Sequence, residues 1–246
     1  MPHAKAEAIT IRLTDFSETS QVASFYTREF GRLSALAKGA KRPRSPFEGQ
    51  LDLLCRCEIV FIRKATTTLH ILTECKLLDR FMGLRADVAR LYAALYAAEL
   101  VREMTPEEES QPAVFDLLLG TLRTLSEGVQ VDVALLVLEV RLLALAGYAP
   151  RLGACVGCGA ADMPAGRVAY SPLLGGALCP NCRSRDPKSP EVPRGALAVL
   201  DRLAGGAVNR LAGLRLPAPM LGVLRKLMKA TYAHLLNHEP KLARYV

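Results

Sequence analysis

The stretch Ala8-Ile-Thr-Ile-Arg-Leu13 alternates with a period of two, which predicts a β-strand. Polar breaks separate it from four further stretches rich in β-branched and aromatic residues, at 21–27, 32–38, 51–63 and 66–73. Five strands in the first 80 residues fit the size of an OB-fold, a partly open five-stranded barrel. Period and strand count alone also allow an SH3-like barrel, so they predict a small barrel and leave its type open.

A basic loop lies between the third and fourth of these strands. It reads Lys38-Gly-Ala-Lys-Arg-Pro-Arg-Ser-Pro-Phe-Glu-Gly49, and its glycines and prolines argue against a regular helix or strand. Four cations, Lys38, Lys41, Arg42 and Arg44, on a flexible loop beside a barrel would suit an arm that contacts phosphates. A solvated surface loop has the same composition, and composition alone does not decide between the two.

The charge of the chain is unevenly distributed. Its 246 residues include 32 Lys and Arg against 24 Asp and Glu, which gives a formal net charge of +8 and a pI of about 9.3. Residues 1–80 carry +4, residues 81–150 carry −5, and residues 151–246 carry +9. Two basic regions separated by an acidic one indicate surfaces with different partners, and a polyanion is one candidate.

Membrane insertion and secretion are not expected from the sequence. No apolar run reaches the ~18 residues that would span a bilayer. The first ten residues lack the apolar core of a signal peptide. We therefore expect a soluble cytoplasmic protein with no membrane contact.

Helical periodicity replaces the strand pattern after residue 83. Apolar residues at three- and four-residue steps predict helices over 88–100, over 112–127 with Pro112 at the start, and over 131–146. The third is almost wholly apolar and is expected to be buried on most sides. Two more helices are predicted to begin at Pro193 and at Pro217 or Pro219. The acidic run Glu107-Glu-Glu109 is predicted to be a solvated turn.

Four of the seven cysteines form two C-x2-C pairs, Cys155-Val-Gly-Cys158 and Cys179-Pro-Asn-Cys182, with 20 residues between them. This spacing is typical of a zinc ribbon or knuckle, in which each pair supplies two thiolates to one tetrahedral Zn²⁺. A redox C-x-x-C or unrelated buried cysteines would not explain two matched pairs. Four thiolates fill the coordination shell and leave no position for a catalytic water, so the predicted ion is structural.

The other three cysteines are predicted to be small core residues in a reducing compartment. Cys55 and Cys57 are two apart and are expected to share one face of a strand, and Cys75 stands alone.

These patterns together predict a multi-domain α+β chain. It consists of an N-terminal OB-fold-like β-barrel (1–80), a first helical part (81–150), an inserted four-cysteine zinc-binding segment (151–192) and a second helical part (193–246).

Motifs for enzyme chemistry are scarce. The sequence has no G-x-x-x-x-G-K-[ST] phosphate loop and no G-x-S-x-G elbow, so neither ATP use nor serine hydrolysis is expected. His234 and His238 are four apart on the last predicted helix, but no Glu follows the first as in H-E-x-x-H. No carboxylate cluster suits a nuclease metal site. The sequence therefore indicates a binding protein rather than an enzyme.

The stretch Phe25-Tyr-Thr-Arg-Glu-Phe-Gly-Arg-Leu33 resembles the T-x-E-x-G-x-L signature of the bacterial RecO family of recombination mediators. In that family the signature leads into a K/R-G-A-[KR]-[KR] loop, which Lys38-Gly-Ala-Lys-Arg42 matches. Thr14-Asp15-Phe16-Ser17-Glu18-Thr19-Ser20 resembles the segment before the second strand of the family. The barrel, the helices and the four cysteines fit the same family, although its members differ in whether they keep all four cysteines.

The resemblance implies a function that composition does not provide. RecO-like proteins bind single- and double-stranded DNA and anneal complementary strands without ATP. They act with the ring-forming partner RecR, remodel DNA coated with single-strand-binding protein (SSB), and help to load RecA. On this basis we expect a cytoplasmic, nucleoid-associated protein whose DNA contacts are Arg12, Arg32, Lys38, Lys41, Arg42 and Arg44.

A second basic surface is expected in the C-terminal part, from Arg210, Arg215, Arg225, Lys226 and Lys229. It could extend the DNA-binding surface or bind the acidic C-terminal tail of SSB, which needs a basic rim around an apolar pocket. RecR is expected to meet the barrel, where it would compete with DNA for part of the basic surface.

The main alternative is a zinc-ribbon transcription or RNA-binding protein with an OB-fold. That alternative predicts sequence-specific binding, whereas a mediator predicts sequence-indifferent and strongly salt-dependent binding. The chain has no Trp and only 6% aromatic residues, so phosphate contacts are expected to dominate over base stacking. A metal-dependent nuclease would need an open metal site, which the sequence does not provide.

Overall fold

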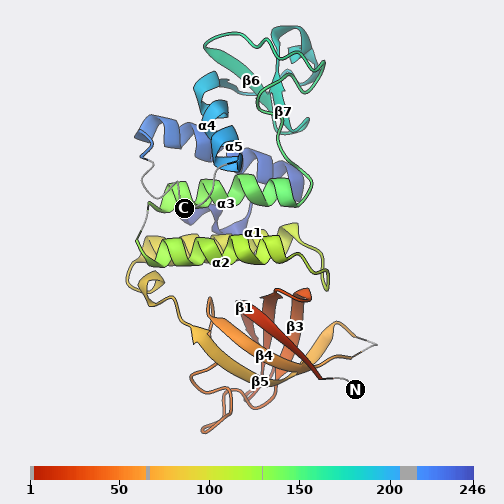
Figure 1. Cartoon of the computed structure of the whole chain (residues 1–246), viewed down its shortest axis with the longest axis vertical. Helices are drawn as coiled ribbons and strands as arrows, with labels where there is room; N and C mark the ends of the chain where they lie inside the picture. The colour runs from red at the N-terminus through yellow and green to blue at the C-terminus, as the bar shows by residue number, and fades with distance from the viewer. Residues whose placement is uncertain (1–2, 65–66, 129, 206–214) are drawn as a thin grey trace. The chain divides into compact units, whose positions relative to one another are not determined.

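The computed structural model describes residues 3–64, 67–128, 130–205 and 215–246. The chain forms two compact units, Met1–Gly128 and Val129–Val246. The first unit contains a β-barrel and two long helices, and the second contains three long helices and a small sheet (Figure 1). The helical stretch at residues 81–150 is thus divided between the two units.

The barrel consists of five strands in the closed order β1-β2-β3-β5-β4. All neighbouring strands are antiparallel except β3 and β5, which pair in parallel. This topology is OB-fold-like and settles the choice of barrel type that the sequence pattern left open. The strands are β1 (His3–Asp15), β2 (Gln21–Thr27), β3 (Gly31–Ala37), β4 (Arg56–Ile62) and β5 (Leu69–Asp79).

Side chains from all five strands fill the barrel, with Phe25, Ile59 and Phe61 among the fully buried ones. Strand β1 differs from its sequence pattern, because residues 8–11 are buried on both faces rather than on one. Their outer face is covered since helix α1 contacts β1 from outside the barrel.

The bounds predicted for the fourth and fifth strands are wrong, and β5 covers Leu69–Asp79 rather than residues 66–73. Strand β4 begins at Arg56 rather than at residue 51, because Leu54 adopts a left-handed backbone with a φ of 57° and forms a turn. Cys55 therefore precedes the strand and does not share a face of it with Cys57. Cys55, Cys57 and Cys75 are nevertheless all buried, as expected.

The first unit continues with a short helix η1 (Met82–Leu84), α1 (Val88–Met104) and α2 (Pro112–Ser126). The Asp87 side chain caps α1 by accepting a hydrogen bond from the backbone N–H of Arg90. Pro112 opens α2, as predicted, and Gly128, with a φ of 85°, follows its end. The two helices contact each other along their length (Figure 1).

The second unit is built on α3 (Val131–Leu145), which contacts both α4 (Arg194–Gly205) and α5 (Ala218–Leu236). Ten of the fifteen residues of α3 are buried, as its apolar sequence predicted. Helix α5 ends at Leu236 because Asn237 is left-handed, so His238 lies beyond the helix and does not pair with His234 on one helical face. A short helix η4 (Lys241–Tyr245) ends the chain. No helix in the described parts is long and apolar enough to cross a membrane.

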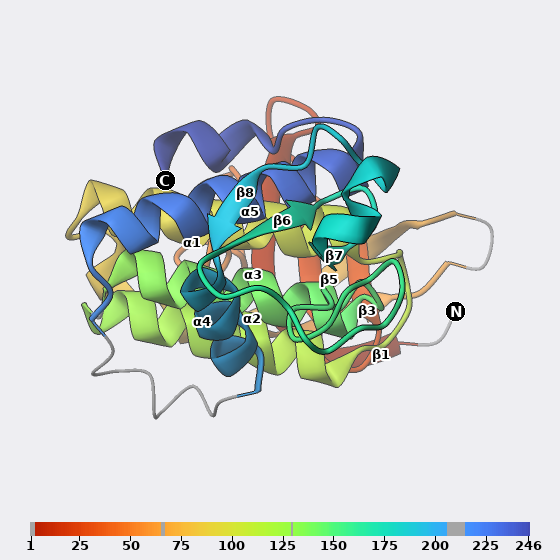
Figure 2. The same ribbon diagram turned by 90° about the horizontal axis from the view of Figure 1, so that it is seen from above.

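The cysteine-containing segment of the second unit forms a three-stranded sheet in the order β7-β6-β8 (Figure 2). Its elements are β6 (Arg167–Ser171), β7 (Gly176–Leu178), the short helix η2 (Pro180–Arg185) and β8 (Glu191–Pro193).

Candidate nucleic-acid interface and metal centre

The basic loop, residues 38–49, is a series of hydrogen-bonded turns. The backbone N–H of Arg42 donates to Gly39, that of Ser45 to Arg42, and that of Glu48 to Ser45, at 3.0–3.1 Å. Phe47 anchors the loop, because its side chain is buried in the barrel core. The sequence predicted a flexible arm, but an inserted aromatic side chain and successive turns hold this loop against the barrel.

The turn between β1 and β2 (residues 16–20, the β1–β2 turn) supports the basic loop. The backbone N–H of Lys41 donates to the carbonyl of Thr19 at 3.0 Å, and that of Gly39 donates to the hydroxyl of Ser20 at 3.1 Å. The Lys41 ammonium also pairs with the Asp15 carboxylate at 2.6 Å. This hydrogen bond, together with one from Gln21, lowers the pKa of Asp15.

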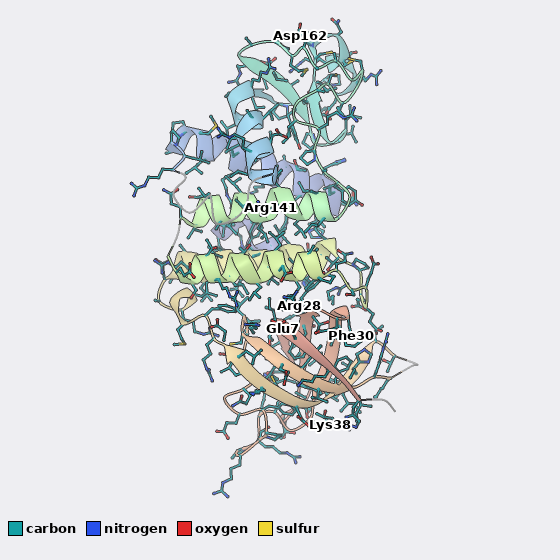
Figure 3. All side chains as sticks on the ribbon, viewed as in Figure 1. Glu7, Arg28, Phe30, Lys38, Arg141 and Asp162 are labelled. Carbon is teal, nitrogen blue, oxygen red and sulfur yellow. The ribbon has the colours of Figure 1, made fainter. Side chains whose placement is uncertain are left out.

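Four of the six predicted DNA-contacting cations are exposed, and no carboxylate of the described residues forms an ion pair with them. They are Arg12, Lys38, Arg42 and Arg44. Arg12 lies on β1 beside a bulge, and the other three lie on the basic loop. Figure 3 shows Lys38 at the opposite end of the barrel from Glu7 and Arg28. We call these four residues the free cations; they are available to a polyanion without first breaking an ion pair.

Arg32 has a different environment from the free cations. Its guanidinium pairs with Glu107 at 2.9 Å, and its carbonyl accepts from the backbone N–H of Glu108 at 2.8 Å. The Ser110 hydroxyl donates to the carbonyl of Arg28 at 3.0 Å. Residues 107–110, which we call the acidic strap, therefore lie along the barrel. Glu107 and Glu109 are exposed, as the prediction of a solvated turn implies, but the prediction missed the bonds that join the strap to the barrel.

Glu108 connects the acidic strap to a buried histidine. Its carboxylate pairs with Arg63 at 2.9 Å and with Nε2 of His70 at 3.2 Å. His70 is only 1% exposed and stacks on Phe61, with its ring centroid 5.3 Å away. Sequence spacing could not reveal this cluster, because its members come from three segments that are distant along the chain.

A second ion-pair network of the barrel is centred on Arg28. Arg28 bonds both Asp116 of α2, at 2.6 Å, and Glu7 of β1, at 3.0 Å, and Glu7 also bonds Arg56 at 2.6 Å. The bond to Asp116 raises the pKa of Arg28. Figure 3 shows Glu7 and Arg28 close together. These arginines hold α2 and the acidic strap to the barrel, so they stabilise the fold and do not belong to the free cations.

The predicted second basic surface is only partly available. Arg210 lies outside the described residues. Arg225 is 18% exposed and pairs with Glu139 at 3.3 Å, and Lys229 pairs with Glu239 at 2.7 Å. Arg215 and Lys226 are exposed. Two of the four described residues of this set therefore form ion pairs within the second unit.

The second unit also contains a cavity of about 440 Å³ between the α3–β6 connection, the β6–β7 hairpin and α5. Apolar side chains of Tyr148, Leu173 and Leu174 line it and remain substantially exposed. Arg151 is the one cation of its lining and forms no ion pair with a described carboxylate. An apolar cavity beside one unpaired arginine suits a partner that ends in an acidic, apolar segment.

The four cysteines of the C-x2-C pairs converge. The sulfur atoms of Cys155, Cys158, Cys179 and Cys182 all lie within 4.8 Å of one another, and the closest hydrogen-bonding pair, Cys158 and Cys179, is 3.8 Å apart. A tetrahedral Zn²⁺ with Zn–S bonds of about 2.3 Å requires sulfur–sulfur distances of about 3.8 Å. The residues therefore fit a single tetrahedral ion.

Local backbone geometry prepares this cluster for a cation. Burial alone would raise the pKa of Cys155, but hydrogen bonds from the backbone N–H groups of Cys179, Cys158 and Gly157 lower it to about 6. Burial and the neighbouring thiols raise the pKa of Cys182 to about 12. A cation among the sulfur atoms would favour the deprotonated form of all four cysteines, because it would stabilise the four thiolates.

Gly157 keeps space for the second pair of cysteines. A Cβ at this position would lie 3.0 Å from Cβ and 3.1 Å from Sγ of Cys182. The absence of a side chain at this position therefore allows close approach of the two cysteine pairs.

An OB-fold-like barrel with an exposed basic loop, followed by helices and a four-cysteine cluster that could hold one metal ion, is an architecture typical of nucleic-acid-binding proteins. Two family models match the chain: "Recombination protein O N terminal" over residues 1–81 and "Recombination protein O C terminal" over residues 85–244. The chain belongs to the RecO family.

Individual relatives agree with this assignment, and each is named a DNA repair protein RecO. The chain is 40% identical to the protein of Rhodopirellula baltica over 72% of this chain and 66% of that protein. It is 33% identical to that of Desulforudis audaxviator over 98% and 95%, and 34% identical to that of Roseiflexus sp. over 96% and 82%. Membership of this family implies DNA repair and recombination, and it disfavours the alternative of a transcription factor.

Proposed function

We propose that this protein is a DNA-binding recombination mediator that binds single- and double-stranded DNA and anneals complementary strands without ATP. The observation that carries the proposal is the set of free cations, Arg12 of β1 and Lys38, Arg42 and Arg44 of the basic loop, which are exposed and form no ion pair with a described carboxylate. Cations that neutralise phosphates lower the repulsion between two approaching strands, and this requires no nucleotide hydrolysis. Arg32 is left out of the proposed contact set because it is bound to Glu107.

The test removes charge from the basic loop and, separately, the same charge from elsewhere in the same unit. The variant R42Q/R44Q is compared with K5Q/R123Q, whose residues are exposed and lie outside the loop. We expect R42Q/R44Q to bind single-stranded DNA more weakly and to anneal SSB-coated complementary strands more slowly. The slope of log K against log salt should fall by about 1.4, since each phosphate contact on a single strand contributes about 0.7. Equal behaviour of the two double variants would contradict the proposal.

Partners follow from the family. We infer that RecR binds the barrel and competes with DNA for part of the basic loop, and that the resulting complex remodels SSB-coated DNA and indirectly loads RecA. Charge reversal at Arg42 and Arg44 should weaken both DNA and RecR binding. Unchanged binding of both partners would rule out a shared surface.

The cavity beside Arg151 is the site that we propose for the acidic tail of SSB. A fluorescent peptide with the sequence of that tail should bind the wild-type protein, and R151E should weaken its binding while leaving binding of naked DNA unchanged. The matched control is R167E, an exposed arginine of the same segment outside the cavity lining. Equal peptide binding by the two variants would place the tail elsewhere.

We propose Zn²⁺ as the ion of the four-cysteine site. Its four thiolate ligands favour this ion and leave no coordination position for a water, so it would crosslink the two C-x2-C pairs and would not take part in a reaction. Metal analysis of the purified protein should give one zinc per chain. A chain with another metal, or with none after purification under reducing conditions, would overturn this assignment.

A further inference from the structure

The β1–β2 turn exposes an aromatic ring. Phe16 is 59% exposed, whereas none of the other six phenylalanines of the chain is exposed to this extent: Phe25, Phe47, Phe61, Phe81 and Phe115 are buried and Phe30 is partly buried. An exposed ring is unfavourable in water unless it contacts a ligand or partner, although single exposed apolar residues are common. The surroundings of Phe16 must therefore show whether its ring has a role.

The turn that carries Phe16 has a fixed shape. The backbone N–H groups of Phe16 and Ser17 both donate to the carbonyl of Ser20, at 3.0 and 3.2 Å, and the Ser17 hydroxyl accepts from the N–H of Ser20 at 3.2 Å. The exposed ring is thus carried by a hydrogen-bonded turn. Such a rigid support keeps an aromatic side chain in place at low entropic cost.

The ring lies next to the proposed phosphate-binding loop. The residue before it, Asp15, pairs with Lys41, and Thr19 and Ser20 of the same turn accept hydrogen bonds from the backbone of Lys41 and Gly39. The β1–β2 turn, which carries the exposed ring, and the basic loop, which carries the free cations Lys38 and Arg42, are therefore bonded to each other. A single nucleic-acid strand presents these two chemistries together, since it has a charged backbone and unstacked bases.

We propose that Phe16 is a stacking platform for a base of single-stranded DNA and that it determines the preference of this surface for single strands over duplex. This inference rests on the proposed DNA-binding function. The bases of a duplex are stacked on one another and cannot reach the ring, so Phe16 would strengthen binding of single strands alone. Stacking on one aromatic residue corresponds to roughly 5- to 100-fold in affinity.

The first experiment compares F16A, F16Y and the wild type in binding a single-stranded oligonucleotide, a duplex of the same length, and an abasic strand that has phosphates but no bases. We expect F16A to lose about fivefold or more in affinity for the single strand, with an unchanged salt slope, and to bind the duplex and the abasic strand as the wild type does. F16Y should restore single-strand binding. A loss by F16A that is equal on all three ligands would overturn the inference.

The second experiment uses the absence of tryptophan from the chain. F16W places one tryptophan in the β1–β2 turn, and M82W places one at another exposed site of the first unit, where Met82 is 64% exposed. Titration with single-stranded DNA should quench the fluorescence of F16W and leave that of M82W unchanged, while the abasic strand should quench neither. Equal responses of F16W and M82W would overturn the inference.

Failure of the inference can be distinguished from failure of the proposed function. If F16A binds single strands normally while R42Q/R44Q binds them weakly, the stacking role is wrong and the DNA-binding function stands. If R42Q/R44Q also binds every ligand as the wild type does, the proposed surface itself is wrong.

Discussion

The barrel and the four-cysteine segment are both small β-structures, but they are stabilised in different ways. Each strand of the barrel pairs on both sides, and its interior is filled by side chains such as Phe25 and Phe61. The sheet of the cysteine segment has strands of only three to five residues, and four sulfur atoms lie close together beside it. From this difference we expect the barrel unit to fold by burial alone and the cysteine segment to depend on a bound ion.

Removal of the metal should give the largest effect. C158S, or treatment with a strong chelator, should unfold the cysteine segment, because metal binding supplies about 10–16 kcal/mol to structural zinc sites in small peptides. Hydrogen exchange should then rise in residues 151–193 and stay unchanged in the barrel. C75S, which alters a buried thiol of the barrel, is the control that should leave the metal content intact. Loss of protection in both regions would show that the two are not independent.

A substitution beside the acidic strap should have the opposite effect: it should destabilise the barrel unit and leave the cysteine segment unchanged. In G31A, the new Cβ would lie 1.8 Å from the carbonyl oxygen of Glu109, at a backbone φ of 65°. Left-handed strain and overpacking together should cost about 2–4 kcal/mol. Chemical denaturation should show this loss in the barrel unit, with zinc content unchanged. G147A, at a similar φ of 84° but with no atom near the new Cβ, should cost less, and an equal loss would exclude steric conflict with the strap as the cause.

The variant E108Q tests how much the ion pairs of Glu108 contribute to the contact between the acidic strap and the barrel. E108Q keeps the shape of the side chain but removes the charge that faces Arg63 and the buried His70. We expect the free energy of unfolding to fall by about 1–3 kcal/mol, since a buried polar group then loses its charged partner. E127Q, a control at an exposed residue that forms no ion pair with the described residues, should have little effect. A stability equal to that of the wild type would mean that the strap is held by its backbone contacts alone.

Gly157 provides a smaller test of the metal-dependent region. G157A should lower the affinity for zinc about tenfold, because the methyl group displaces Cys182 by a few tenths of an ångström. G153A has open space around its Cβ and should bind zinc as the wild type does. Competition with a zinc-binding dye would measure both affinities. If both variants bind equally, the close approach of the two pairs is not limited by residue 157.

The smallest expected effect concerns the surface pair of Asp15 and Lys41. The bond from Lys41 lowers the pKa of Asp15 below its ordinary value of 3.8, so the pair is present above that pH and is lost as the pH falls through the lower value. An NMR titration should show this low pKa, and K41M should bring it back toward 3.8. An unchanged titration in K41M would assign the shift to Gln21.

Much of the fold could be predicted from local sequence. The starts of α2 and α5 followed from prolines, and the metal ligands followed from the spacing of two C-x2-C pairs. The acidic strap could not be predicted, because its position depends on contacts between residues 28–32 and 107–110, which no periodicity records. The sequence also failed to predict that the basic loop has an ordered conformation. Its composition is typical of flexible loops, but the buried side chain of Phe47 holds it against the barrel.

The acidic strap also has a consequence for the solubility of this chain. Strand β3 pairs with β5 only over residues 34–37, so its first half would present an open edge to solvent. The strap covers that edge through a bridge between Arg32 and Glu107 and places three carboxylates beside it. Open strand edges are templates for pairing between molecules, and charged cover prevents it. The strap therefore gives the barrel an edge that a second copy of the chain cannot extend.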